Sequence, residues 1–384
     1  MSLPRIRATR AKPLLLVGAV VTLLLSVHLQ GPSTTRTSAG RVAASARDRG
    51  TPVNAAFAGL ELVYGRHTLT PTTVSAITRV ADPGTVPVTA FELALSSGNS
   101  AYPRLPVATM VADPDAYAAA AGLPSLAAQL RHGVVLSTTE ARLRGAKLGS
   151  RLRTVDGRQL DVSGVVDDRF LGGYELAASR ALLEGAPTGA SYLLVPDGTS
   201  ATAIRRAVGA ISVRIVKQPR NGFFSSDDTV LTQAMMTAHF GEFATTVSRG
   251  SIRLDRSWTH RWLASTSLPQ LGVVTCNRAI LADLRAAMVE VTARGLGRLV
   301  HTADFQREGG CWSPRVVRFG DGGRLSSHAW GIAVDINVDV NPLGGPPRQD
   351  PRLVAVMRAH GFFWGGDFLR PDGAHFEWVG HYAA

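Results

Sequence analysis

The two segments that most constrain the fold lie near the C-terminus, where apolar and polar residues alternate. In residues 332–338, every second position is apolar (Ile332, Val334, Ile336 and Val338). Successive side chains of a strand point to opposite faces, so this pattern predicts a strand with one packed face and Asp335 on the other. Phe376 and Trp378 alternate with His375 and Glu377 in the same way. The C-terminal part is therefore expected to contain a small sheet.

Three side chains around these strands form a candidate metal site. His328 precedes the first strand, with Gly331 allowing the chain to turn between them, and His375 opens the second strand. Together with Asp335 they offer two imidazoles and one carboxylate. This set suits Zn²⁺, with donors at about 2.0–2.2 Å and a fourth position left to water.

A general base for such a site is also present. A zinc-bound water has its pKa lowered to about 7 and can attack a carbonyl group. Asp372 lies three residues before His375 across a glycine turn, where it is placed to take that proton. Glu377 shares the face of His375 and is the alternative base.

Helices are predicted on both sides of the first strand. Residues 277–294 read as an amphipathic helix that Gly295 ends. Asp350 and Pro351 predict the start of another helix, which ends before Gly361. The fold class is therefore α+β, with a small antiparallel C-terminal sheet flanked by helices and preceded by a separate α+β region.

The spacing of these residues resembles that of a known family. The patterns Ser326-x-His328-x-x-Gly331-x-Ala333-x-Asp335 and Asp372-x-x-His375 are similar to the signature of the peptidase M15 family. This family contains zinc D-alanyl-D-alanine carboxypeptidases and L-alanyl-D-glutamate endopeptidases. Trp364-Gly365-Gly366 and the segment 310–315 also match, and the resemblance spans residues 258–380.

The resemblance implies a role for each matched residue. His328, Asp335 and His375 would be the zinc ligands, and Asp372 would be the acid/base. Arg315 would face the carboxylate of the substrate, the alternative being a surface ion pair. The implied substrate is the stem peptide of peptidoglycan. Two rival hypotheses are a non-catalytic, zinc-stabilised module that binds the cell wall or a partner, and a peptidase acting on other peptides.

The N-terminus predicts export. Four basic residues precede an apolar run over residues 13–29, as in an export signal. We expect residues 1–30 to form a membrane anchor or a cleaved signal, residues 31–53 to form a flexible linker, and the rest to lie outside the cytoplasm. Residues 1–50 hold eight basic residues and one acidic residue, so they account for most of the net charge of +12. The remaining charge is unremarkable and no nucleic-acid motif occurs, so no nucleic-acid partner is expected.

The chain contains two cysteines, Cys276 and Cys311. In an oxidising compartment an isolated pair usually forms a disulfide bond. Two buried free thiols or a zinc site are the alternatives.

The middle region is expected to be a separate α+β region over residues 54–249, followed by the zinc peptidase domain over residues 250–384. A helix is predicted at 125–131, a strand at 191–195, and a helix from Ser225 or Ser226 toward Phe243. Asp156-Gly157 predicts a hairpin between 152–155 and 160–166. Residues 134–168 resemble the extracytoplasmic core domain of ABC-transporter permeases, which implies contacts with a protein partner or the wall.

Overall fold

The computed structural model describes residues 56–65, 67–81, 84–96, 106–217, 229–243, 245–248, 251–307, 310–315, 324–368 and 370–380. The expected anchor (1–30) and linker (31–53) lie outside these residues. Within the described part, no helix is both long and apolar enough to cross a membrane. Residues 52–384 form one compact unit.

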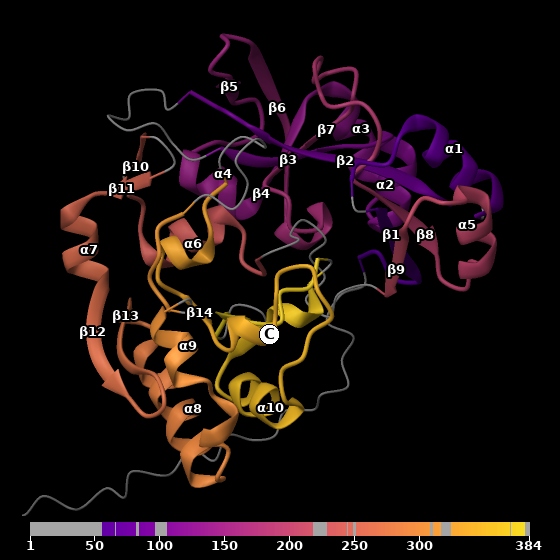
Figure 1. Ribbon diagram of the computed structural model, residues 1–384. Helices are drawn as coiled ribbons and strands as arrows, with labels where there is room; N and C mark the ends of the chain where they lie inside the picture. Colours follow the sequence, from indigo (N-terminus) through magenta and orange to yellow (C-terminus); the bar gives the residue numbers. More distant parts are fainter. Residues whose placement is uncertain are drawn as a thin grey trace, which may run out of the picture. The chain divides into compact units, whose positions relative to one another are not determined.

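A nine-stranded mixed sheet organises the middle region, in the order β5-β6-β4-β7-β3-β2-β8-β1-β9 (Figure 1). β3 runs parallel to β7 and β4 parallel to β6, while the other neighbours are antiparallel. The strands are β1 Leu60–Gly65, β2 Val86–Leu93, β3 Val107–Val111, β4 Val134–Ser137, β5 Arg151–Arg153, β6 Gln159–Val166, β7 Leu176–Ala178, β8 Tyr192–Pro196 and β9 Val213–Lys217.

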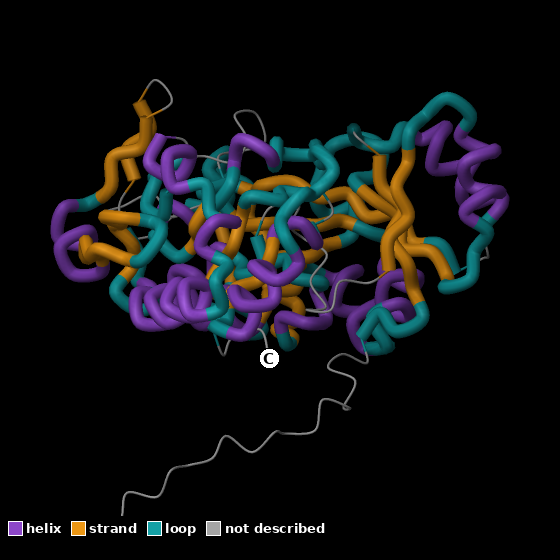
Figure 2. The backbone as a smooth tube through the Cα atoms, turned by 60° about the horizontal axis from the view of Figure 1, so that its bottom comes forward, coloured by secondary structure: helices purple, strands orange, loops and turns teal. Residues whose placement is uncertain are grey.

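Five helices accompany this sheet; Figure 2 shows helices beside its strands. Each of the five has apolar residues in the core. They are α1 Pro71–Val80, α2 Pro114–Ala120, α3 Ser125–His132, α4 Thr138–Arg144 and α5 Ala201–Val208, with a 3₁₀ turn η1 at Asp168–Leu171. Side chains cap four of them, since Thr70, Asp113, Ser137 and Ser200 each accept a hydrogen bond from a first-turn amide. The mixed α+β class predicted for this region is confirmed.

The local predictions in this region hold because they rest on turn and cap chemistry. β5 and β6 pair antiparallel around Asp156-Gly157, and Gly157 adopts a φ of +92°, as the hairpin requires. The predicted helix at 125–131 is α3, and the predicted strand at 191–195 is β8.

The C-terminal part contains three small sheets and five helices among the described residues (Figure 1). The sheets are the pairs β10–β11 and β12–β13, and the three-stranded sheet β14-β16-β15. The strands are β10 Thr245–Ser248, β11 Ser251–Leu254, β12 Leu263–Leu268, β13 Gly272–Asn277, β14 Ala333–Asp335, β15 Phe362–Trp364 and β16 His375–Trp378. The helices are α6 Gln233–Phe240, α7 Arg256–Trp262, α8 Leu281–Ala293, α9 Thr302–Arg307 and α10 Pro351–Ala359; 3₁₀ turns are η2 Gly297–Leu299, η3 Ser327–Ala329, η4 Val338–Val340 and η5 Gly365–Asp367.

Some boundaries differ from those predicted. β14 ends at Asp335 because Asn337 takes a left-handed conformation (φ 61°) and starts η4. The long amphipathic helix begins at Leu281 rather than Asn277, whose side chain instead accepts a hydrogen bond from the amide of Ala279. α10 begins at Pro351 with Asp350 as its cap, as predicted.

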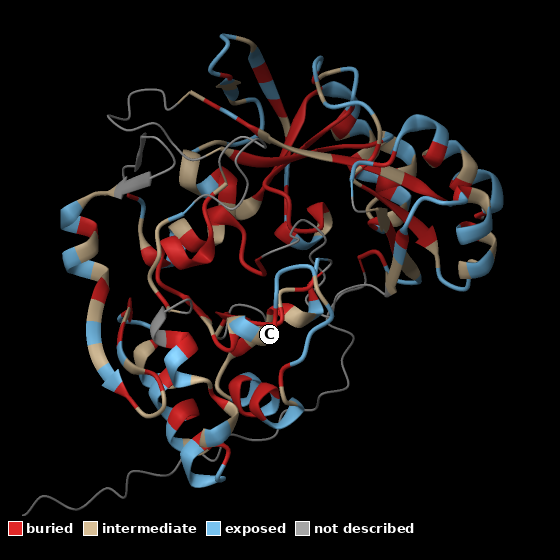
Figure 3. Ribbon diagram, viewed as in Figure 1, coloured by how far each residue is buried: buried red, intermediate tan, exposed pale blue. Residues whose placement is uncertain are grey.

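Residues 230–243 pack with the C-terminal core. α6 is capped by Thr232, whereas the cap predicted at Ser225 or Ser226 lies outside the described residues. Val230, Leu231, Met236 and Phe240 are buried in one cluster with residues of α8, α10 and β16. Figure 3 shows that much of α6 is buried. The core of the C-terminal part therefore begins about 20 residues before position 250, where the sequence placed the domain boundary.

Candidate metal centre

The strand register brings two of the three candidate ligands together. β14 and β16 are antiparallel neighbours, and Asp335 lies directly opposite His375. Directly opposed residues of such a pair project from the same face, so both side chains point to one place. The sheet thus joins positions that are 40 residues apart in the chain.

A tight turn delivers the third ligand. His328 lies in η3, where the backbone amide of His328 donates a hydrogen bond to the hydroxyl of Ser326. Gly331 then reverses the chain with a φ of +68°. A Cβ at this position would lie 2.8 Å from the amide nitrogen of Asn277, so only glycine lets the turn approach β13 this closely.

The three ligand atoms form a nearly equilateral triangle. His328 Nε2 lies 3.0 Å from Asp335 Oδ1 and 3.2 Å from His375 Nδ1, and the last two atoms are 3.0 Å apart. Tetrahedral donors at about 2.0–2.2 Å from one ion lie about 3.4 Å from each other. The described residues contain this one group of three or more His, Cys, Asp or Glu that could hold a metal ion. Its donor types and spacing fit zinc.

A backbone contact fixes the tautomer of His328. Its Nδ1 lies 2.7 Å from the carbonyl oxygen of Cys311, which can only accept a hydrogen bond. Nδ1 therefore carries the proton, and Nε2 keeps its lone pair for a metal. Cys311 is itself joined to Cys276 by a disulfide bond, so the predicted pairing is present.

Burial and mutual charge set the protonation of the ligands. Burial lowers the pKa of His328, which favours the neutral, metal-binding imidazole. Burial alone would raise the pKa of Asp335, but the two imidazoles beside it hold that pKa well below its usual range. Burial opposes a charge on His375 as well, yet Asp335 and Glu377 raise the pKa of His375 to about 10. Without a metal, a proton on His375 therefore balances the carboxylate at neutral pH.

Asp372 lies beside the site, on the turn that leads into β16. Its amide donates to the carbonyl of Gly365, and its own carbonyl accepts from the amide of His375. Its carboxylate is partly exposed, and burial of the remainder raises the pKa of Asp372. A partly exposed carboxylate with a raised pKa is suited to accept a proton from water.

Arg315 lies at the edge of the same site. Its Nη2 is 3.1 Å from Asp335 Oδ2, the oxygen that the histidines do not use. The side chain of Arg315 remains 44% exposed. The guanidinium has five N–H donors, so this contact leaves room for a second carboxylate.

A family comparison agrees with this geometry. The model of a family described as D-alanyl-D-alanine carboxypeptidase, of the peptidase M15 group, matches residues 320–378. Over these residues the chain is similar to the peptidase M15 family. Curated proteins gave no match. The resemblance of residues 134–168 to permease domains is not supported by the comparisons.

The M15 match covers all three candidate ligands and Asp372, and it indicates a peptidase of the D-alanyl-D-alanine carboxypeptidase type. Arg315 lies just before the matched residues. The hydrolase class expected from the sequence thus has support that is independent of the ligand geometry.

Glu377, the alternative base, lies in different surroundings from Asp372. Its side chain is fully buried, and its oxygens accept hydrogen bonds from Thr229, Val230 and Leu231. A carboxylate enclosed by protein donors has no access to water in the site. Of the two candidate bases, Asp372 is therefore the one that water can reach.

The contact between Glu377 and Thr229 was not foreseen. The two residues are 148 positions apart, and Thr229 carries no motif of its own. One feature of the sequence could have indicated this contact. Glu377 is an acidic residue at an alternating position of a buried strand, so its carboxylate needs hydrogen-bond donors.

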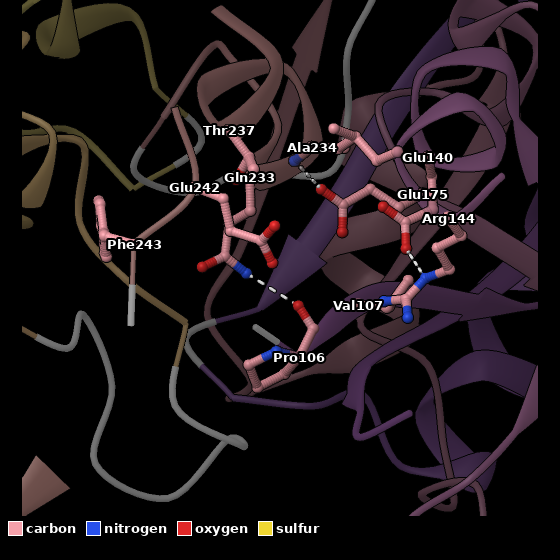
Figure 4. A pocket seen from close by; sticks show the side chains of 11 residues that line it. Pro106, Val107, Glu140, Arg144, Glu175, Gln233, Ala234, Thr237, Glu242 and Phe243 are labelled. Atoms are coloured by element: carbon pink, nitrogen blue, oxygen red, sulfur yellow. Dashed lines mark hydrogen bonds and ion pairs between the residues drawn. The ribbon is translucent and has the colours of Figure 1, made fainter. Parts of the chain in front are cut away.

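A separate pocket lies between α4, α6 and the start of β3 (Figure 4). It encloses about 450 Å³, part of it open to solvent, and it is lined by Glu140, Arg144, Glu175, Gln233 and Glu242 among others. Glu140 and Arg144 form a buried ion pair there. The candidate metal ligands do not line this pocket.

Proposed function

We propose that this protein is an extracytoplasmic zinc peptidase that hydrolyses an amide bond in the stem peptide of peptidoglycan. The reaction would be of the D-Ala-D-Ala carboxypeptidase or the L-Ala-D-Glu endopeptidase type. The observation that carries the proposal is the triangle of His328 Nε2, Asp335 Oδ1 and His375 Nδ1 inside the segment matched by the carboxypeptidase family. The apolar N-terminal run would hold the protein at the membrane or direct its secretion.

The residues around the triangle support a hydrolytic role. Zinc held by His328, Asp335 and His375 would supply a Lewis acid for the scissile carbonyl and would acidify water. Asp372 would accept the proton of the attacking water and return it to the leaving amine. Arg315 would pair with a carboxylate of the substrate while keeping Asp335 in place.

Chelation distinguishes this proposal from a zinc-stabilised binding module. The full chain is incubated with purified muropeptides, and the products are read by mass spectrometry before and after zinc removal. We expect cleavage that stops on chelation and returns with added zinc. Muropeptides that stay intact, with chelation only lowering the melting temperature, would support the binding module instead. Cleavage of unrelated peptides but not of muropeptides would point to the other peptidase hypothesis.

A further inference from the structure

The environment of Glu377 suggests a role beyond that of a buried strand residue. Its Oε1 accepts hydrogen bonds from Thr229 Oγ1 at 2.9 Å, from the Leu231 amide at 2.9 Å and from the Val230 amide at 3.1 Å. Its Oε2 lies 3.2 Å from the same Val230 amide. The carboxylate is therefore fixed by a segment from a remote part of the chain.

The second oxygen of this carboxylate faces a candidate metal ligand. Glu377 Oε2 lies 3.8 Å from Nε2 of His375, whose Nδ1 faces Asp335 and His328. An imidazole that ligates through Nδ1 must carry its proton on Nε2. A negative charge beside Nε2 stabilises that tautomer and strengthens the other nitrogen as a ligand.

Burying the carboxylate of Glu377 has a free-energy cost that an apolar residue at this position would avoid. Burying a carboxylate is expensive unless donors and an opposite charge compensate for it. Amide and hydroxyl donors from residues 229–231 hold one oxygen, and the Nε2 side of His375 faces the other. Leu or Met would fill this strand position without that cost, but neither could select a histidine tautomer.

The segment that holds Glu377 is itself anchored at its other end. The Ala234 amide donates to Glu175 Oε1 at 2.6 Å, and Gln233 Nε2 donates to the Pro106 carbonyl at 3.1 Å (Figure 4). Gln233 Oε1 accepts from the amide of Leu325, three residues before His328. Residues 229–234 are thus tied both to the large sheet and to the metal site, which leaves Glu377 little freedom to move.

We propose that Glu377 is a positioning residue of the metal site, which orients His375 so that Nδ1 faces the metal, and that residues 229–231 hold Glu377 in place. The inference rests on the zinc site of the proposed function. It assigns Glu377 no contact with substrate.

The inference is tested by the zinc affinity of the full chain. This affinity is measured by competition with a chromophoric chelator. Glu377→Gln keeps an oxygen for the donors of residues 229–231 but removes the charge beside His375. Loss of such a partner typically weakens metal binding by about 10–100-fold, and we expect a loss in this range. The matched control is Glu140→Gln, which alters another buried carboxylate, one that pairs with Arg144 and makes no contact with Glu377 or His375. Its zinc affinity is expected to stay within about threefold of wild type.

The outcomes separate the inference from the proposed function. A wild-type chain that binds no zinc would refute the proposed zinc site itself. Wild-type affinity in Glu377→Gln, or an equal loss in Glu140→Gln, would overturn the positioning role. Ser327→Ala is the third arm, because Ser327 Oγ also lies near His375 Nε2, at 3.5 Å. A loss in Ser327→Ala alone would assign the role to that serine.

A second measurement does not depend on the variants folding. In the zinc-loaded wild-type chain labelled with ¹⁵N-histidine, the ring nitrogens report which one carries the proton. We expect His375 to be protonated on Nε2 and ligated through Nδ1. A proton on Nδ1 with ligation through Nε2 would contradict the inference.

Discussion

At the scale of single residues, the three ligands differ in how they are prepared for a metal. Asp335 is ionised and His328 is neutral, but the pKa of His375 is raised to about 10, so His375 carries a proton at neutral pH in the metal-free protein. A metal must displace that proton before it can bind Nδ1. Metal binding and proton release are therefore coupled at one histidine.

This coupling predicts a pH dependence of zinc binding. Between pH 6 and 7, below the pKa of His375 and no higher than the pKa of about 7 expected for a zinc-bound water, each bound zinc should release about one proton, from this residue. The apparent affinity should therefore rise about tenfold per pH unit. Calorimetry in buffers of different ionisation enthalpy measures the proton count. Binding without proton release would show that His375 is already neutral in the metal-free protein.

At the scale of elements, the turn before β14 depends on a glycine. Gly331→Ala puts a Cβ 2.8 Å from the Asn277 amide in a residue with a φ of +68°. We expect the free energy of unfolding to fall by about 2–4 kcal/mol, from strain and steric overlap together. Gly295→Ala is the control, because its φ is +66° but its Cβ would have no neighbour within 4 Å. It should cost only about 1–2 kcal/mol. Equal losses in urea unfolding would show that β13 yields to the added methyl group.

The disulfide bond also acts at this scale, since it ties β13 to the carbonyl that orients His328. The loop it closes spans 35 positions, so replacing both cysteines with alanine should destabilise the protein by about 3–4 kcal/mol in the chain-entropy model. Unfolding in denaturant measures this loss. The variant should also bind zinc more weakly, because the Cys311 carbonyl is less firmly held. Unchanged stability and zinc affinity would show that the surrounding core already fixes Cys311.

Elements with local signals were predictable from the sequence, as were the long-range contacts between cysteines or between motif residues, but other long-range contacts were not. The hairpin at Asp156-Gly157 and the start of α10 at Pro351 follow from turn and cap residues. The ligand set follows from residue type and spacing, with Asp335 and His375 in one strand pair and His328 in the turn before it. The early end of β14 depends on the left-handed backbone conformation of Asn337. The alternation of apolar and polar residues does not indicate this conformation. The hydrogen bond between Glu377 and Thr229 joins positions far apart in the chain, so no pattern near either residue indicated it.

At the scale of the whole molecule, the core of the C-terminal part includes more than residues 250–384. Val230, Leu231, Met236, Phe240 and Phe243 are buried in its core. Each such side chain contributes about 1.5–3 kcal/mol, and together they approach the whole stability of an ordinary domain.

A fragment of residues 250–384 should therefore lack a cooperative thermal transition, whereas a fragment of residues 229–384 should regain one. The shorter fragment also loses the donors that compensate the buried charge of Glu377. Circular dichroism melting of both fragments, with and without zinc, measures this difference. Equal, cooperative melting would show that the shorter fragment repacks without residues 229–243.

In the proposed function, Asp372 and the three-ligand site would act together as a zinc peptidase. The most direct test compares wild type, Asp372→Asn and His375→Ala for zinc content and muropeptide cleavage in one preparation. A positioned general base contributes about 10²–10⁴-fold in rate, so Asp372→Asn should keep its zinc and lose cleavage by that factor. His375→Ala should lose both, because it removes a ligand. Undiminished cleavage in Asp372→Asn, or a wild-type chain that holds zinc and leaves muropeptides intact, would contradict the account.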